Sequence, residues 1–329
     1  MSINAVVIHG PHDIRVEKRP LPAIQEDHDA IVRVSVAGIC GSELHPYRGQ
    51  QKTTFGHIMG HEYTGIVTAI GSKVTSVKTG DRVFGLFSTS CLRCWFCKQG
   101  YTNRCTRSLA LGTAQINGCQ AEFVRVPDAD GSLMLAPPEI EDELLAMMSD
   151  IFPTGYYGAM RAISQLTQPL LTAVTRGCGT VFCVDTVEDR LAEAKRMGGI
   201  PLRLGTDDIK AAVLKATDGR GADAAIENVG NEAALSMAFD LLRVCGHLSS
   251  VGFHQSALPF TALQGYQKNI SLNMGRAPVR AILEEALEVF VQNKDKFTNA
   301  VSHRLPLSDA AMGYELFSTQ KARKVILRP

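Results

Sequence analysis

The stretch from Gln168 to Asp185, "QPLLTAVTRGCGTVFCVD", decides how the middle of this chain is interpreted. Its last letters, "TVFCVD", form an apolar run closed by an acidic residue, which predicts a buried strand ending at Asp185. The following "EDRLAEAKRMGG" has helical periodicity and a glycine stop, and "IPLRL" predicts another short strand. A strand, a helix and a second strand in this order favour parallel pairing of the strands.

The same alternation continues downstream. "DDIKAAVLKATDG" predicts a helix, "GADAAIENVG" a strand, "EAALSMAFDLLRVCG" a helix closed by Gly246, and "HLSSVGF" a further strand. Repeated units of this kind predict an α/β fold, with a doubly wound parallel sheet, right-handed crossovers and helices on both faces.

Length and charge set the broad class of protein. The chain has 329 residues, which suits two domains, and its formal net charge is +1. Such a small charge provides no field to attract nucleic acid or an acidic membrane surface. No apolar run approaches the ~20 residues of a membrane span, and the N-terminus lacks the basic region of a signal peptide. We therefore expect a cytoplasmic protein with no nucleic-acid or membrane partner.

A cysteine cluster, "CLRCWFCKQGYTNRC", carries the most specific local motif. The spacing C-x2-C-x2-C-x7-C suits four thiolates at the corners of a tetrahedron, the geometry that zinc prefers. Four unrelated surface thiols are disfavoured, because exposed free cysteines are a liability. Four ligands leave no open position on the metal, so we expect a structural zinc site. Its ligands would be Cys91, Cys94, Cys97 and Cys105.

A second set of metal-ligating residues is spread over three segments, "AGICGSELHPYRG", "FGHIMGHEYTG" and "MMSDIFPTGYYG". A catalytic zinc needs three protein ligands and one open position. Cys40, His61 and Asp150 would supply one sulfur, one nitrogen and one oxygen. Considered singly, a histidine is usually satisfied by a backbone partner, and an aspartate before "IFPTG" usually caps a turn.

Three further residues of these segments could serve such a site. Glu62 follows His61 and could support the metal ligands or exchange with one of them. Ser42 and His45 could pass a proton from the metal site to bulk water.

In combination, the motifs resemble those of the zinc-dependent medium-chain dehydrogenases/reductases, the alcohol dehydrogenase superfamily, over nearly the whole chain. The four-cysteine lobe matches the structural zinc lobe of that family. Asp150 resembles the third zinc ligand of a branch that includes formaldehyde-dehydrogenase-like proteins. The family's Cys-Gly-Ser/Thr-x-x-His and Gly-His-Glu motifs match Cys40, Ser42, His45, Gly60, His61 and Glu62.

The resemblance implies a GroES-like catalytic domain over residues 1–150, a Rossmann-type nucleotide-binding domain over 151–294 and a return to the catalytic domain over 295–329. It also implies two zinc ions per chain, NAD, a small-molecule alcohol or carbonyl substrate, and a homodimer or homotetramer. The cofactor would contact Asp185, Thr154 and Arg323. Asp185 stands where the family binds the ribose of NAD, but an aspartate at a strand end can equally cap the next helix, and both roles stay open.

One part of the expected nucleotide-binding domain is missing. The family places a helix, a central strand, a G-x-G-x-x-G loop and a second helix between Tyr157 and Gly177, and this stretch is too short to hold them. We estimate that about 15–20 residues are absent, the size of one strand and its loop. "PLLTAVTRG" is then interpreted as the tail of a helix, and the rival interpretation makes "LLTAV" a strand of a hairpin. The resulting Rossmann-type sheet would be incomplete, with two edges that must pair anew or stay open.

The gap leaves two functions open. The first is a zinc oxidoreductase that interconverts an alcohol and a carbonyl with NAD(H). The second is a redox-neutral zinc enzyme, a lyase, isomerase or cyclase, in which the metal acts only as a Lewis acid. A relic, or a gene model that lacks an exon, is the third interpretation, and the intact metal ligands argue against it. The loss of two charge-assisted hydrogen bonds to the pyrophosphate would weaken NAD binding by roughly 10²–10⁴-fold.

Overall fold

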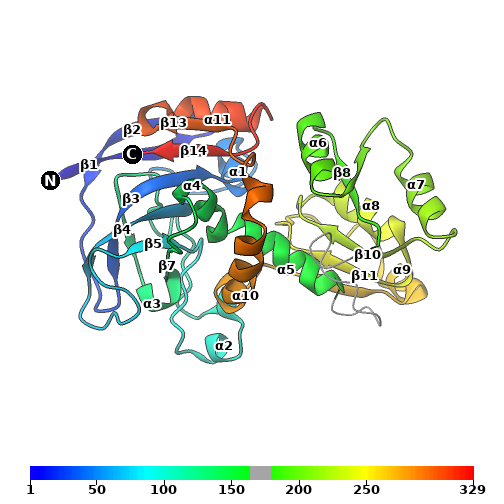
Figure 1. Cartoon of the computed structure of the whole chain (residues 1–329), viewed down its shortest axis with the longest axis horizontal. Helices are drawn as coiled ribbons and strands as arrows, with labels where there is room; N and C mark the ends of the chain where they lie inside the picture. Colours follow the sequence, from blue (N-terminus) through cyan, green and yellow to red (C-terminus); the bar gives the residue numbers. More distant parts are fainter. Residues whose placement is uncertain (164–178) are drawn as a thin grey trace. The chain divides into compact units, whose positions relative to one another are not determined.

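The structure, a computed structural model, describes residues 1–163 and 179–329 (Figure 1). These residues form two compact units, one of Met1–Pro153 with Pro278–Pro329 and the other of Thr154–Ala277. The chain returns to the first unit at Pro278, whereas the sequence placed the return at 295. The reason is α10 (Val279–Gln292), whose Phe290 is buried and lies with its ring centroid 4.9 Å from that of Phe152.

A seven-stranded sheet forms the centre of the first unit, in the order β13-β14-β3-β4-β5-β7, and β6 also pairs with β3. A separate antiparallel hairpin joins β1 to β2. The strands of this unit are β1 Ser2–Gly10, β2 Asp13–Pro20, β3 Ala30–Ile39, β4 Glu62–Ile70, β5 Arg82–Gly85, β6 Phe123–Val126, β7 Leu133–Leu135, β13 His303–Pro306 and β14 Val325–Arg328. Its α-helices besides α10 are α1 Leu44–Tyr47, α2 Trp95–Lys98, α3 Ala129–Ser132, α4 Asp142–Leu145 and α11 Ala310–Ser318. Helix α5 (Ile151–Ile163) begins in this unit and continues into the second.

The second unit has the strand–helix alternation that the sequence predicts. Its parallel strands form two described sheets, β8-β9 and β10-β11-β12. The strands are β8 Phe182–Asp185, β9 Ile200–Arg203, β10 Ala222–Glu227, β11 Leu242–Ser250 and β12 Ser271–Met274, and the helices between them are α6 Glu188–Arg196, α7 Ile209–Ala216, α8 Glu232–Leu241 and α9 Ala262–Lys268. The mixed α/β fold is therefore confirmed.

One predicted boundary in this unit is wrong. The sequence favours a helix that runs to Gly246, but α8 ends at Leu241 and β11 begins at Leu242. Leu242 pairs with Ala222 at the start of β10, and this long-range pairing overrides the local helical periodicity. The residues "LRVCG" extend the strand backwards, with Cys245 at a φ of 58° where the pairing register shifts.

The order of the described strands bears on the missing segment. Among the described residues, β8 pairs only with β9, and β10 pairs only with β11, so no described strand joins the two sheets. Our interpretation of "PLLTAVTRG" as a helix tail, and the expected absence of a glycine-rich loop there, fall almost entirely on residues 164–178 and lie outside the described part of the chain. Both stay predictions.

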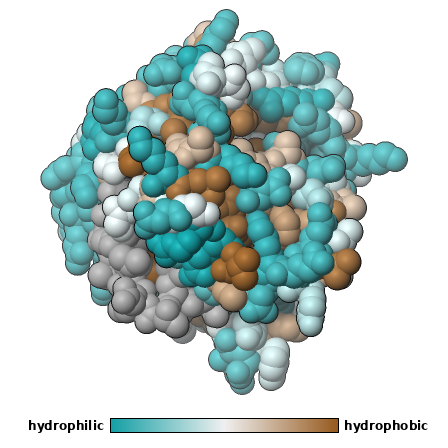
Figure 2. All heavy atoms as spheres, turned by 90° about the vertical axis from the view of Figure 1, so that its right-hand side faces the viewer, coloured by the Kyte–Doolittle hydropathy of each residue, from teal (hydrophilic) through white to brown (hydrophobic). Residues whose placement is uncertain are grey.

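Over the described residues, no helix combines the length and the apolar character that crossing a membrane requires. In the view of Figure 2, apolar side chains occur as separate patches among mostly hydrophilic ones.

Candidate metal centres

The antiparallel pairing of β3 with β4 brings the first two residues of the spread-out set together. Gly38 of β3 lies opposite Glu62 of β4, so Cys40, just after β3, and His61, just before β4, come close in space. Asp150 follows a 3-10 turn, Ala146–Ser149, that is fastened to β4 by a hydrogen bond from the Tyr63 N–H to Ser149 Oγ (3.1 Å). Three segments far apart in sequence thus meet at one place inside the first unit.

The donor atoms at this place have the spacing of a metal site. Ligand atoms of Cys40, His61, Glu62 and Asp150 all lie within 4.8 Å of one another. His61 Nε2 is 3.4 Å from Asp150 Oδ2, and Cys40 Sγ is 3.9 Å from the same oxygen. Tetrahedral zinc with ordinary bond lengths separates a nitrogen from an oxygen by about 3.3 Å and a sulfur from an oxygen by about 3.5 Å. The observed separations are close to these values.

His61 provides a test of whether a cation fits. Its Nε2 atom is buried and makes no hydrogen bond within the described chain, although it faces Asp150 and Cys40. Burial alone would lower the pKa of His61, but the nearby charges of Cys40 and Asp150 raise that pKa well above its usual value. A buried histidine nitrogen without a hydrogen-bond partner, beside a cysteine sulfur and a carboxylate, fits a divalent cation such as zinc, which would replace the proton on that nitrogen.

Glu62 is held from behind the site. It is fully buried and forms an ion pair with Lys324, a buried residue just before β14 whose Nζ also donates to Ile39 O (3.1 Å). Burial would lower the pKa of Lys324, but Glu62 and Cys40 raise that pKa above its usual value, so the side chain is a cation. The sequence analysis did not identify Lys324, and its only signal is a lysine beside the apolar run "VIL".

Close packing around this ion pair explains Gly38. A Cβ atom at position 38 would lie 2.4 Å from Glu62 Oε2, so a side chain there must displace the carboxylate. We expect Gly38→Ala to lower the free energy of unfolding by about 1–3 kcal/mol, the typical cost of overpacking a core. Denaturant unfolding of the zinc-loaded protein measures this change.

Gly41→Ala is the matched control, because a Cβ at Gly41 has no neighbour within 4 Å. Equal unfolding free energies for the two variants would contradict the expected clash at position 38.

The two residues expected to carry protons, Ser42 and His45, closely follow Cys40 in the chain. Ser42 is exposed, and its hydroxyl donates to Cys40 Sγ at 3.4 Å. His45 is half-buried in the one-turn helix α1 that follows. Ser42 is therefore both exposed and beside Cys40, whereas the proton-carrying role of His45 stays a prediction.

Glu43 is a site residue that the sequence analysis missed. It is buried between Ser42 and His45, and its Oε1 lies 3.5 Å from His61 Nδ1. Burial raises the pKa of Glu43, while His61 and the Cys40 N–H limit that rise. An acidic residue inside the quoted motif "CGSELH" was the available signal.

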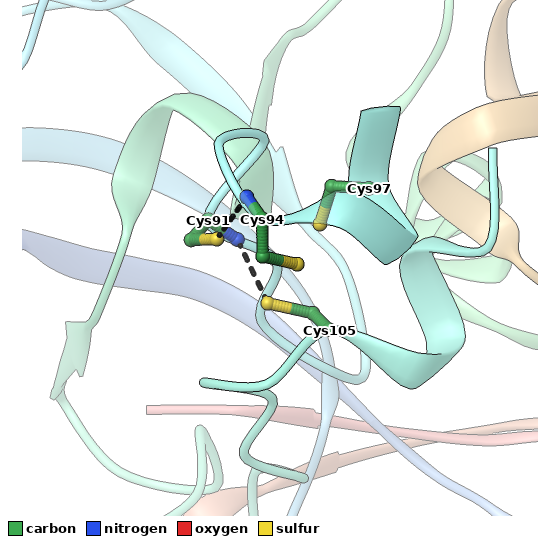
Figure 3. A group of neighbouring side chains, drawn as sticks. All are labelled: Cys91, Cys94, Cys97 and Cys105. Carbon is green, nitrogen blue, oxygen red and sulfur yellow. Dashed lines mark hydrogen bonds between the residues drawn. The ribbon is translucent and has the colours of Figure 1, made fainter. Parts of the chain in front are cut away.

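The second candidate centre is the four-cysteine cluster, which the structure gathers as the spacing predicts (Figure 3). The sulfur atoms of Cys91, Cys94, Cys97 and Cys105 all lie within 4.8 Å of one another. Backbone groups point at the sulfurs: the Cys91 N–H donates to Cys105 Sγ at 3.3 Å, and the Cys94 N–H donates to Cys91 Sγ at 3.4 Å. The N–H groups of Cys97 and Thr106 lower the pKa of Cys94 to about 6, which favours the thiolate that binds zinc.

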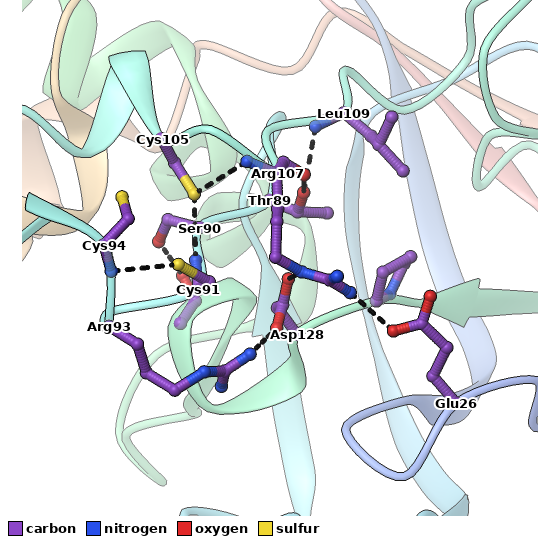
Figure 4. A network of polar contacts seen from close by, with 12 residues as sticks. Glu26, Thr89, Ser90, Cys91, Arg93, Cys94, Cys105, Arg107, Leu109 and Asp128 are labelled. Carbon is purple, nitrogen blue, oxygen red and sulfur yellow. Dashed lines mark hydrogen bonds and ion pairs between the residues drawn. The ribbon is translucent and has the colours of Figure 1, made fainter. Parts of the chain in front are cut away.

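A network of charges fixes this lobe to the rest of the first unit (Figure 4). Asp128 is buried and accepts hydrogen bonds from Arg93 Nη2 (2.7 Å) and Arg107 Nε (3.0 Å), and Arg107 also pairs with Glu26. Arg93 and Arg107 flank the cysteines in sequence, and the Arg107 N–H donates to Cys105 Sγ at 3.4 Å. Both arginines therefore connect the metal ligands to a carboxylate far along the chain.

The expected cofactor residues are described within their own units. Asp185 ends β8 and accepts hydrogen bonds from the N–H groups of Thr186 (2.7 Å) and Val187 (2.9 Å), and it lies 3.5 Å from Arg190. These bonds hold the turn after β8, but the N-cap of α6 is Val187 and has no side-chain cap, so Asp185 is not the helix cap and its ribose role stays a prediction. Thr154 lies half-buried in the first turns of α5, and Arg323 is half-buried just before β14.

Comparison with known proteins agrees with the fold and with a zinc-binding protein. The family model for the alcohol dehydrogenase GroES-like domain matches residues 26–138, and the zinc-binding dehydrogenase model matches 170–292. A curated relative, zinc-type alcohol dehydrogenase B of Aspergillus flavus, is 41% identical over 348 residues, covering 99% of this chain and 81% of the relative. The chain therefore belongs to the zinc-dependent medium-chain dehydrogenase/reductase superfamily and is an oxidoreductase of the alcohol dehydrogenase type.

Two further relatives are similar over most of their length. The medium chain reductase/dehydrogenase ucsI of an Acremonium species is 42% identical over 290 residues, covering 81% of this chain and 99% of the relative. The solved structure of the alcohol dehydrogenase TADH from Thermus sp. ATN1 superposes with a TM-score of 0.91 at 31% identity, covering 99% of both chains.

Proposed function

We propose that the protein interconverts an alcohol and a carbonyl compound at a zinc ion held by Cys40, His61 and Asp150. The observation that carries this proposal is the buried meeting of one sulfur, one nitrogen and one oxygen donor, with His61 Nε2 left without a hydrogen bond among the described residues. Asp150 as the third ligand supports placement in the formaldehyde-dehydrogenase-like branch. When bound, zinc would act as a Lewis acid that polarises the substrate oxygen.

The protein's own residues then supply the remaining functions. The Ser42 hydroxyl, beside Cys40, would take the proton from the substrate hydroxyl, and His45 would carry that proton toward solvent. The ion pair with Lys324 would keep the Glu62 carboxylate close to the metal ligands, where it could exchange with one of them. A second zinc ion, held by the four cysteines, would stabilise the lobe.

We further propose NAD(H) as the hydride carrier, bound weakly. Asp185 would contact the ribose, and Thr154 and Arg323 would support the rest of the dinucleotide. Alignments with relatives run over 348 and 363 residues although this chain has 329, which supports a segment that the relatives possess and this chain lacks.

Calorimetric titration with NAD and NADP tests this part of the proposal, with the Thermus alcohol dehydrogenase as the intact control. We expect affinity for NAD to be about 10²–10⁴-fold lower than in the control, because backbone N–H donors to the pyrophosphate would be lost. Affinity equal to the control would contradict the loss of the phosphate loop. Zinc-dependent turnover without any nucleotide binding would instead favour the redox-neutral lyase, isomerase or cyclase.

The setting of this activity is proposed by analogy with the family. We propose a homodimer or homotetramer in the cytoplasm that acts on a small-molecule alcohol or carbonyl compound. Size-exclusion chromatography with light scattering checks the assembly, and a monomer would contradict it.

A further inference from the structure

A buried polar group lies behind His61, on the side of Nδ1. Besides Glu43 it contains Gln120, which precedes β6, and Tyr314 of α11, and both side chains are fully buried. Gln120 Nε2 donates to Glu43 Oε2 at 3.1 Å, and the Tyr314 hydroxyl lies 3.1 Å from the same oxygen. The helix near the end of the chain thus contributes a side chain directly behind a proposed metal ligand.

The hydrogen-bond donors of this group can be assigned. Gln120 Nε2 faces two acceptors, Gly38 O (3.0 Å) and Glu43 Oε2, so both amide protons are used and the orientation of the amide is determined. Gln120 Oε1 must then accept, and the Tyr314 hydroxyl donates to it at 2.8 Å. Burial raises the pKa of Tyr314 well above its usual value, so the hydroxyl keeps the proton that it shares between Gln120 and Glu43.

This assignment determines how Glu43 faces His61. Glu43 Oε2 is occupied by the Gln120 amide, the Tyr314 hydroxyl and the Cys40 N–H (3.1 Å). Its Oε1 has no hydrogen bond within the described part of the chain and lies 3.5 Å from His61 Nδ1. An Nδ1–H group directed at this oxygen leaves the lone pair of His61 on Nε2, which is the atom that faces Cys40 and Asp150.

We propose that Tyr314 is a positioning residue of the catalytic metal site, which together with Gln120 orients Glu43 so that Glu43 in turn orients His61. This inference rests on the proposed function, because it assumes that His61 binds the metal. Tyr314 is not itself a proposed metal ligand, and its effect is transmitted through its contacts with Gln120 and Glu43 and then through the contact of Glu43 with His61. The affinity of the site for the metal would therefore depend on the packing of α11, the helix that carries Tyr314.

The test compares Tyr314→Phe with Tyr47→Phe, each of which removes one hydroxyl from the same buried cluster. The two rings lie 5.4 Å apart, but the Tyr47 hydroxyl bonds Glu315 (3.2 Å), outside the group behind His61. Zinc affinity is measured by competition with a chromogenic chelator. The part of the titration that is lost in Cys40→Ser is assigned to zinc at the catalytic site.

We expect Tyr314→Phe to weaken zinc binding at this site by about three- to tenfold, on the order of one hydrogen bond, and Tyr47→Phe to leave it unchanged. The visible absorption of Co²⁺ bound in place of this zinc should shift only in Tyr314→Phe. Identical affinity and absorption in the two variants would overturn the proposal. A Cys40→Ser protein that retains the full zinc content of the unmodified protein would instead contradict the proposed metal site itself.

Gln120→Met provides an independent variant if Tyr314→Phe does not fold. It removes the amide N–H that donates to Glu43 and the amide oxygen that accepts from Tyr314, and it should weaken zinc binding in the same direction, by about tenfold. Because the two side chains act through one carboxylate, the double variant should lose less affinity than the product of the two single losses. Independent losses would show that Tyr314 and Gln120 do not act through Glu43.

Discussion

Replacing His61 with alanine is expected to lower turnover by about 10³-fold or more. The metal would lose one of its ligands, and with it the several kcal/mol by which the metal stabilises the charge that develops in the transition state. Asp150→Ala should have an effect of similar size, since two remaining ligands cannot hold an open site. The side chains of both residues lie in the buried site of the first unit, and His61 Nε2 and Asp150 Oδ2 are 3.4 Å apart. Steady-state kinetics and elemental analysis on the same preparations measure the two losses together.

His57→Gln is the matched control for His61→Ala. His57 is buried in the same segment, "FGHIMGHEYTG", but its Nδ1 lies 3.0 Å from Thr54 O and it is not in the donor cluster. We expect this variant to keep its zinc and most of its turnover. Full activity in His61→Ala would place the reaction elsewhere in the protein.

Replacing Cys94 with serine is expected to remove one of two zinc ions and to destabilise the lobe severely. Structural zinc contributes about 10–16 kcal/mol of apparent binding free energy, and part of that energy folds a segment with little core of its own. The cluster formed by the four cysteines packs mainly upon itself, as expected of a lobe held together by a metal. Elemental analysis and thermal unfolding measure the zinc content and the stability.

Cys245→Ser is the control for this experiment, because Cys245 is exposed and lies in neither donor cluster. It should retain two zinc ions and an unchanged unfolding temperature. If Cys94→Ser also retained both, the four cysteines would not form the structural site that their spacing predicts.

The second unit shows where local sequence patterns predict the structure correctly and where they fail. The strand that ends at Asp185 and the helix after it were predicted closely, because apolar runs, helical periodicity and a glycine stop are all local signals. The end of α8 was predicted wrongly, because the pairing of Leu242 with Ala222 is decided by residues some distance apart in sequence. Periodicity cannot reveal a partner that lies on another strand.

The residues proposed as metal ligands were predicted from sequence alone, and the structure brings each set together. Short spacings such as C-x2-C bring thiolates together through one turn of backbone, and the motifs around Cys40 and His61 combine residue types that few other sites need. The α/β alternation was determined in the same way, by patterns only a few residues long.

Only the tertiary structure identified the residues that support these ligands. Lys324 and Tyr314 reach the site from the end of the chain, and Asp128 reaches the cysteine lobe through two arginines. Lysine, tyrosine and aspartate occur throughout any soluble chain, so their type and spacing do not reveal these contacts. The sheet register and the packing of α11 bring these polar groups together in the interior. Because water is excluded there, each group forms its hydrogen bonds or ion pairs with the other buried groups.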